Sequence, residues 1–184
     1  RSLFDRLGYT IGDYHNSSSQ CSTVGNDTTL GNEVIGLINF MKGNDYFDYD
    51  GDCDLTEVRT HVMGDIYHSQ LVEVGSPDMN IDFTNNNEEA YHRSSNNYQN
   101  FMSDFNGRKN ILYAGSNSGV LHAINAETGK EEWGFIPPFI GALLPQIVNT
   151  DLDGKVDGNK GGTNPIFGVD GSPVVHDALI EGYD

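Results

Sequence analysis

Basic residues are scarce in this 184-residue chain, which has 10 Lys and Arg against 27 Asp and Glu and a formal net charge of −17. A field of that sign repels phosphate backbones and anionic lipid headgroups, so we expect no nucleic-acid partner. Apolar runs are short as well, and none reaches the roughly 18 residues of a transmembrane helix, so we expect no membrane insertion. The excess carboxylates would instead attract divalent cations.

Cysteines and catalytic motifs are also few. Cys21 and Cys53 form no C-x-x-C pair, which argues against a zinc or redox motif and leaves open whether they form a disulfide. The six histidines form no H-x-x-x-H or H-E-x-x-H pattern, and no G-x-S-x-G elbow or glycine-rich phosphate loop occurs. His68 and Ser69 are adjacent in an expected strand and would face opposite sides, which disfavours proton transfer between them. We therefore expect no enzymatic activity.

Turn-forming residues and aromatic residues are plentiful, with 22 Gly, nine Tyr, nine Phe and one Trp. This composition predicts an all-β architecture with short helices and long loops. Its clearest part is an antiparallel meander with expected strands at 110–115, 120–125 and 131–136. The turns between them are expected at 116–119 and 126–130.

The remaining elements are expected from weaker patterns. Apolar residues at helical spacing predict an amphipathic helix over 33–42, and the cluster Gly43-Asn44-Asp45 ends it. A strand is expected over 66–75, and another begins at 171–177. The polar connection at 78–109 has room for a helix. Other polar stretches are expected to be loops, at 1–32 (with a short strand near 7–11), 45–57 and 148–164.

The meander segment YAGSNSGVLHAINAETGKEEWGF resembles one blade of a quinoprotein-like β-propeller, in which Trp133 would pack between neighbouring blades. Other segments resemble the PilY/PilC-type proteins, the type IV pilus tip-associated adhesins. Met63–Ser69 looks like their LGDIxHSxP segment, Tyr113–Ala126 like YVGANDGMLHAFNA, and Gly168–Val175 like FVDGSPTV. Leu37–Asp45 is similar to their helical LVNFLRGD stretch.

The resemblance implies that 1–184 is the N-terminal part of a β-propeller domain, with a loop-rich lead-in at 1–32 and blades with acidic insertions at 33–184. A propeller needs about 4–8 blades, and this sequence suffices for two or three, so we expect a fragment of a longer protein. The family implies export to the cell surface and a place at the pilus tip. It also implies roles in pilus biogenesis, control of retraction and adhesion. The implied partners are pilus subunits or minor pilins and a host or abiotic surface, whose identity the sequence does not reveal.

One acidic loop has the spacing of a calcium site. Its sequence is N-x-D-x-D-G-x-x-D, with side-chain oxygens at loop positions 1, 3, 5 and 9 and glycine at position 6. The expected ligands are Asn149, Asp151, Asp153, the Lys155 backbone carbonyl and Asp157. Ca²⁺ suits this set, because it accepts 6–8 oxygens in flexible geometry. The bidentate glutamate of an EF-hand is missing, since position 12 is a lysine. A solvated Asp/Gly turn is the alternative.

A second acidic run, Asp48–Asp54, has alternating carboxylates in a poorer register, and both a second ion and a hydrated loop stay open. Two other functions also stay open. One is a fragment of a quinoprotein dehydrogenase, which would use pyrroloquinoline quinone with Ca²⁺ and shares the blade signature. The other is an envelope scaffold propeller without catalysis.

Overall fold

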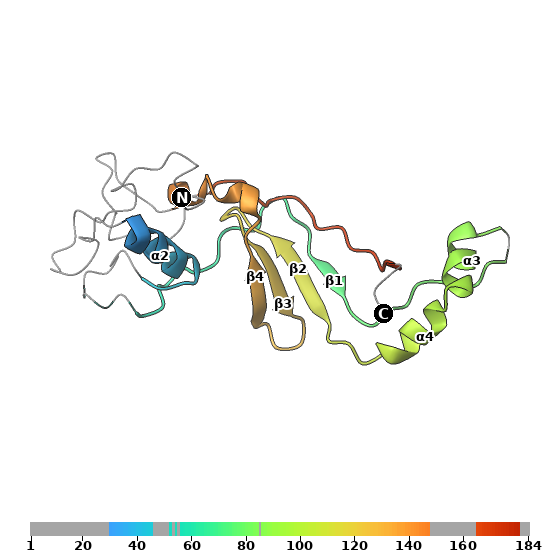
Figure 1. Cartoon of the computed structure of the whole chain (residues 1–184). Helices are drawn as coiled ribbons and strands as arrows, with labels where there is room; N and C mark the ends of the chain where they lie inside the picture. The colour runs from blue at the N-terminus through green and yellow to red at the C-terminus, as the bar shows by residue number, and fades with distance from the viewer. Residues whose placement is uncertain are drawn as a thin grey trace. The chain divides into compact units, whose positions relative to one another are not determined.

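A computed structural model of the chain describes residues 30–45, 52, 54, 56–84, 86–147 and 165–180 (Figure 1). The chain divides into two compact units, each of which is described by itself. Unit 1 comprises 1–69, 115–121 and 135–171, and unit 2 comprises 70–114, 122–134 and 172–184.

Unit 2 holds most of a four-stranded antiparallel sheet with the strand order β1-β2-β3-β4 (Figure 1). Its strands are β1 (Val72–Val74), β2 (Ile111–Gly115), β3 (Leu121–Asn125) and β4 (Glu131–Phe135). β1 pairs with β2 so that Glu73 lies opposite Leu112. The expected meander is therefore confirmed, and β1 extends it by one strand.

The β3–β4 turn explains why the meander could be recognised from local sequence. Asn125 Oδ1 accepts the backbone N–H groups of Glu127 and Thr128, both at 3.0 Å. The Gly129 N–H donates to the Asn125 carbonyl at 2.9 Å, and Gly129 has a φ of 68°. Asparagine at the start of a turn and glycine at a left-handed position are what such a turn requires.

Two expected strands differ from the structure. Only Val72–Val74 of the 66–75 segment forms a strand, and the strand expected to begin at 171–177 is absent from the described residues 171–180. Apolar β-branched residues such as Val174 and Val175 favour a strand only where a neighbouring strand supplies hydrogen-bond partners. Pro173 also lacks the N–H group that a ladder needs.

The β1–β2 connection contains two short helices, α3 (Glu88–Ser95) and α4 (Tyr98–Asp104). Asn87 caps α3, because its Oδ1 accepts the Ala90 N–H at 3.1 Å. Glu88 and Glu89 occupy the first turn, where a negative charge is favourable. The helix expected somewhere in 78–109 is thus confirmed as two.

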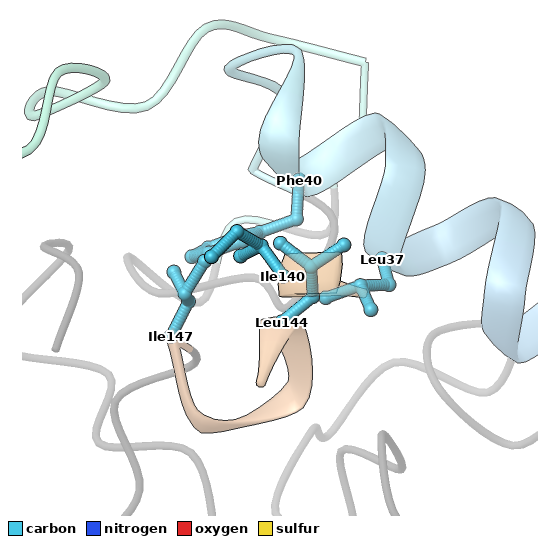
Figure 2. Packing of buried hydrophobic residues seen from close by; sticks show 5 residues of the cluster. All are labelled: Leu37, Phe40, Ile140, Leu144 and Ile147. Carbon is cyan, nitrogen blue, oxygen red and sulfur yellow. The ribbon is translucent and has the colours of Figure 1, made fainter. Parts of the chain in front are cut away.

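Unit 1 is built around α2 (Leu30–Met41) and two 3-10 helices, η1 (Pro138–Ile140) and η2 (Leu144–Ile147). The helix expected over 33–42 is confirmed, with an earlier start. Figure 2 shows the buried core between these helices, made of Leu37, Phe40, Ile140, Leu144 and Ile147. Burying one such side chain contributes about 1.5–3 kcal/mol, so this cluster is the main apolar support of the unit.

A single antiparallel sheet with short helices and long connections is compatible with the all-β prediction. The quinoprotein-like propeller stays a prediction.

Candidate functional site

Three segments that are far apart in the sequence meet in unit 1. They are residues 63–69, the β2–β3 turn region 115–121, and residues 165–171, and together we call them the three-segment junction. The Asn117 N–H donates to the Asp65 carbonyl at 2.8 Å, and the Ile166 N–H donates to the Asn117 carbonyl at 2.7 Å. These segments overlap the three sequence motifs that resemble the pilus proteins. The motifs are separate in the sequence and are in contact in the structure.

Close packing at the junction depends on two glycines. A Cβ atom on Gly115 would lie 2.1 Å from the Val169 carbonyl oxygen, and one on Gly64 would lie 2.6 Å from the Ser118 Cβ. Both distances are far below van der Waals contact. The Gly115 N–H also donates to the Ser69 hydroxyl at 3.0 Å. The backbones therefore approach too closely at these points for any side chain.

The polar side chains of the junction do not form a catalytic pair. His68 Nδ1 lies 2.8 Å from Asp170 Oδ2, with 58% of the histidine side chain exposed. The neighbouring Ser69 hydroxyl instead receives the Gly115 N–H. His68 is exposed and lies outside any strand, so the strand expected over 66–75 does not include it. His122 is buried in β3 and lies 2.6 Å from Glu131 Oε1.

One buried polar atom of the junction has no hydrogen-bond partner among the described residues. The Asn117 side chain is buried, with 4% of the residue exposed, and its Oδ1 receives no hydrogen bond from that part of the chain. Ser116 and Ser118, on either side, are satisfied by each other at 2.8 Å between their hydroxyl oxygens. A buried amide oxygen that lacks a partner costs roughly 1–3 kcal/mol of stability.

The predicted calcium ligands Asn149, Asp151, Asp153, Lys155 and Asp157 lie outside the described residues. The chain on either side of them is described. Ile147 is fully buried in the unit 1 core. Ile166 packs against the same cluster, and its backbone N–H belongs to the junction. The described residues on either side of the predicted loop thus belong to one core.

The second acidic run, Asp48–Asp54, is described only at Asp52 and Asp54. Asp52 Oδ1 accepts the Asp54 N–H at 2.7 Å, and Asp54 Oδ1 accepts the hydroxyl and the N–H of Thr56 at 2.7 and 2.9 Å. The Thr56 hydroxyl and N–H lower the pKa of Asp54. No group of three potential metal ligands occurs among the described His, Cys, Asp and Glu side chains.

The chain on either side of this run is held together by backbone pairing. Asn44 and Val58 form an antiparallel bridge, and the Arg59 N–H donates to the Gly43 carbonyl at 3.0 Å. The Arg59 guanidinium is buried 3.9 Å from the centroid of the Phe40 ring and donates to the Phe40 carbonyl. The residues that flank the acidic run therefore contact the unit 1 core through Arg59 and Phe40.

In the part of the chain that the structure describes, no helix has the length and apolar character needed to cross a bilayer.

The chain is similar to curated pilus proteins over about two thirds of its length. Type IV pilus biogenesis factor PilY1 of Pseudomonas aeruginosa strain UCBPP-PA14 is 35% identical over 124 residues, which are 67% of this chain and 10% of that protein. The PilY1 homolog of Xylella fastidiosa strain Temecula1 is 32% identical over 121 residues, 66% of this chain and 9% of that protein. PilY1 of P. aeruginosa strain PAO1 is 30% identical over 129 residues, 70% of this chain and 10% of that protein. The chain thus spans about a tenth of the length of these relatives. Neither a family model nor a solved structure matches it.

Proposed function

This chain is a homologue of one segment of the PilY1 type IV pilus biogenesis factors, and from that relationship we propose that it acts in pilus biogenesis at the cell surface. The observation that carries the proposal is the three-segment junction. The three motifs that resemble the pilus proteins lie in segments that hydrogen-bond to one another in unit 1. A role in holding this core together accounts for their residue types without any catalytic step.

The partners follow from the same relationship. Pilus subunits or minor pilins are the proposed protein partners, and the proposed place is the pilus tip, where the protein supports assembly, opposes retraction and contacts a host or abiotic surface. Named relatives are pilus biogenesis factors, which favours this function over a quinoprotein dehydrogenase.

Calcium binding by residues 149–157 is the second part of the proposal. Four oxygen-bearing side chains and one backbone carbonyl are hard donors, which fit Ca²⁺ and suit softer metals poorly. Binding would neutralise three aspartates that otherwise repel one another in a chain of net charge −17. Because Ile147 and Ile166 both contact the unit 1 core, ordering of the loop between them would be transmitted to that core.

The calcium assignment is tested by calorimetric titration of the wild-type chain and of two aspartate variants. Asp153→Ala removes a predicted ligand, and we expect the Ca²⁺ affinity to fall at least about tenfold. Asp104→Ala removes an aspartate at the end of α4, outside the loop, and should bind Ca²⁺ like the wild type. Equal affinities for all three proteins would refute the site.

The pilus role is tested independently of calcium. Deletion of the gene that encodes this chain should lower the number of type IV pili on the cell surface, and expression of the wild-type gene should restore them. Unchanged pilus numbers in the deletion strain would refute the role in biogenesis and leave the calcium assignment standing.

A further inference from the structure

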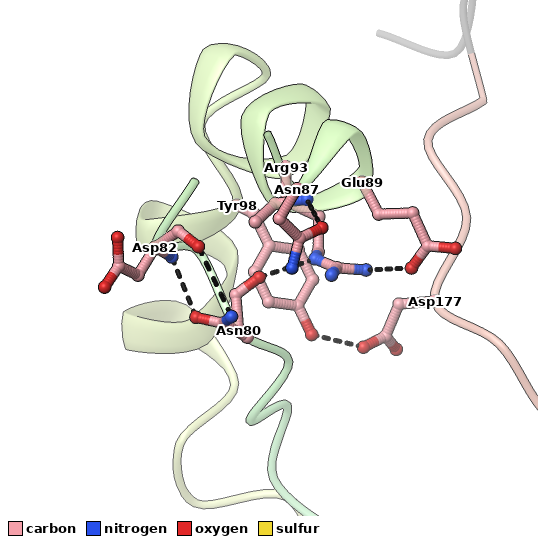
Figure 3. Close-up of polar contacts among 8 residues, drawn as sticks. Asn80, Asp82, Asn87, Glu89, Arg93, Tyr98 and Asp177 are labelled. Carbon is pink, nitrogen blue, oxygen red and sulfur yellow. Dashed lines mark hydrogen bonds and ion pairs between the residues drawn. The ribbon is translucent and has the colours of Figure 1, made fainter. Parts of the chain in front are cut away.

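Unit 2 contains a surface pocket of about 260 Å³ between its helical insertion and the segment 176–179. Its apolar lining includes Met79, Phe101 and Leu179, and its polar lining includes Tyr98 and Asp177. These residues come from the stretch before α3, from α4 and from the segment 176–179. Figure 3 shows the polar contacts beside the pocket.

A fixed carboxylate lies in this pocket. The Tyr98 hydroxyl donates to Asp177 Oδ2 at 2.5 Å, and Tyr98 itself is buried (Figure 3). Burial raises the pKa of Tyr98, and the hydrogen bond to Asp177 raises it further. The phenol therefore keeps its proton and continues to donate a hydrogen bond to Asp177. No second hydrogen bond from the described residues reaches Asp177, which leaves its other oxygen available to a ligand.

The Arg93 guanidinium also lines the pocket, and its positive charge has a carboxylate partner. Arg93 donates from Nε to the Asn80 carbonyl at 2.7 Å, and its Nη1 lies 3.4 Å from Glu89 Oε2 (Figure 3). Its guanidinium is thus held by a neighbouring loop and by a carboxylate on its own helix. His92 and His176 also line the pocket, and each adds a positive charge only when protonated. The carboxylate of Glu89, which is exposed and does not line the pocket, offsets the Arg93 charge, and Asp177 supplies the carboxylate of the lining.

Two aromatic rings strengthen the preference for a cation. The rings of Tyr98 and Phe101 are 5.5 Å apart between centroids, and both line the pocket. Ring faces attract ammonium groups, and the effect grows where water is partly excluded. The net charge of −17 raises the local concentration of cations around the whole chain.

We propose that this pocket binds a primary alkylammonium group, with the ammonium beside Asp177 and the Tyr98 and Phe101 rings and the aliphatic stem along Met79 and Leu179. A lysine side chain of a protein partner and a free aliphatic diamine share this chemistry. The inference does not depend on the proposed function, because no residue of the junction or of the predicted calcium loop lines the pocket.

The first test compares two probes of equal length and opposite charge. The 184-residue chain is titrated with pentylammonium and with pentanoate at pH 8 and low salt, where an ordinary histidine is neutral, and binding is followed by NMR chemical shifts. We expect pentylammonium to shift the signals of Phe101 and Asp177, and pentanoate to leave them unchanged. Equal binding of both probes, or no binding of pentylammonium, would overturn the proposal.

The second test locates the ammonium with matched variants. Asp177→Asn removes the charge and keeps an oxygen that can accept from Tyr98, and we expect pentylammonium to bind about fivefold to tenfold more weakly. Glu127→Gln removes one charge from the exposed β3–β4 turn, so its binding should stay within about twofold of the wild type. Equal weakening in both variants would show a general charge effect and overturn the assignment. Phe101→Leu should also weaken binding, and its circular dichroism spectrum reports whether it folds.

The source of the group is settled by two further probes. Pentane-1,5-diamine represents a free diamine, and the peptide acetyl-Gly-Lys-Gly-amide represents a partner's lysine. Tighter binding of the peptide would assign the pocket to a protein partner, and tighter binding of the diamine would assign it to a small metabolite. Both outcomes support an alkylammonium site, and failure of both probes would contradict it.

Discussion

Substitution of Gly115 by alanine is the sharpest test of the three-segment junction. The added Cβ would lie 2.1 Å from the Val169 carbonyl oxygen and 3.1 Å from the Gly171 carbonyl oxygen. Both neighbours are backbone atoms, so relief requires the 165–171 segment to move rather than a side chain to rotate. Overpacking of this kind typically costs 1–3 kcal/mol, and we expect a loss of about 2–3 kcal/mol in the free energy of unfolding.

The matched control is Gly107→Ala. Gly107 lies in the turn before β2, and a Cβ added there would meet no atom within 4 Å. Its unfolding free energy should stay within about 0.5 kcal/mol of the wild type, or rise slightly because the unfolded chain loses freedom. The unfolding free energies of both variants are measured by urea unfolding, and the slope of free energy against urea concentration is compared with that of the wild type. Amide hydrogen exchange at Asn117 and Ile166 should accelerate only in Gly115→Ala. Equal stability of the two variants would refute the close approach of Gly115 to residues 165–171.

Two further predictions concern single side chains. Arg59→Met should lower the unfolding free energy by about 2–3 kcal/mol, because it removes the hydrogen bond to the buried Phe40 carbonyl and the cation–π contact with the Phe40 ring. Thermal unfolding measures the loss, and an unchanged midpoint temperature would contradict the prediction. The pKa of Tyr98 is raised above its ordinary value of 10.0, so the stability linked to its protonated form is complete below pH 10 and is lost as the pH rises through the folded pKa. Tyr98→Phe should abolish that alkaline loss in pH-dependent urea unfolding, and phenolate absorbance should show one late-titrating tyrosine fewer. A parallel alkaline decline in both proteins would argue against the Tyr98–Asp177 contact.

A third side-chain prediction concerns Asp54, whose pKa the Thr56 hydroxyl and N–H hold below the ordinary value. Any stability linked to this depressed pKa is present above the unfolded value and is lost as the pH falls through the folded one. Thr56→Ala should move the Asp54 pKa back toward its ordinary value, as measured by NMR of the carboxyl carbon. An unchanged titration would show that the hydroxyl is not the main cause.

Local patterns predicted the elements whose shape depends on neighbouring residues. The meander could be recognised because Asn125 and Gly129 are suited to the turn that joins β3 to β4. The helix before Gly43 could be recognised from its apolar spacing, and its end is marked by the positive φ of that glycine. The prediction of a strand beginning at 171–177 failed because pairing with a neighbouring strand decides that outcome, and the described residues 171–180 form no strand.

The pocket in unit 2 shows a different limit of sequence analysis. Its lining combines residues 79–101 with residues 176–179, and neither stretch carries a recognisable motif. His176 and Asp177 belong to an expected strand, in which nothing marks them as part of a site. The two segments form a pocket only because Tyr98 and Asp177 meet across 79 positions of the chain.

The sequence alone determined the net charge, the residues that form the turns, the resemblance to pilus proteins and the spacing of oxygen-bearing residues at 149–157. Each of these depends on composition, on residues close together in the chain or on the order of motifs. Tertiary structure alone decided that residues 63–69, 115–121 and 165–171 are in contact. Their contacts are backbone hydrogen bonds and glycine approaches between distant segments. Such contacts have no local sequence signature, because the residues around a glycine or a carbonyl do not reveal which distant segment will pack against it.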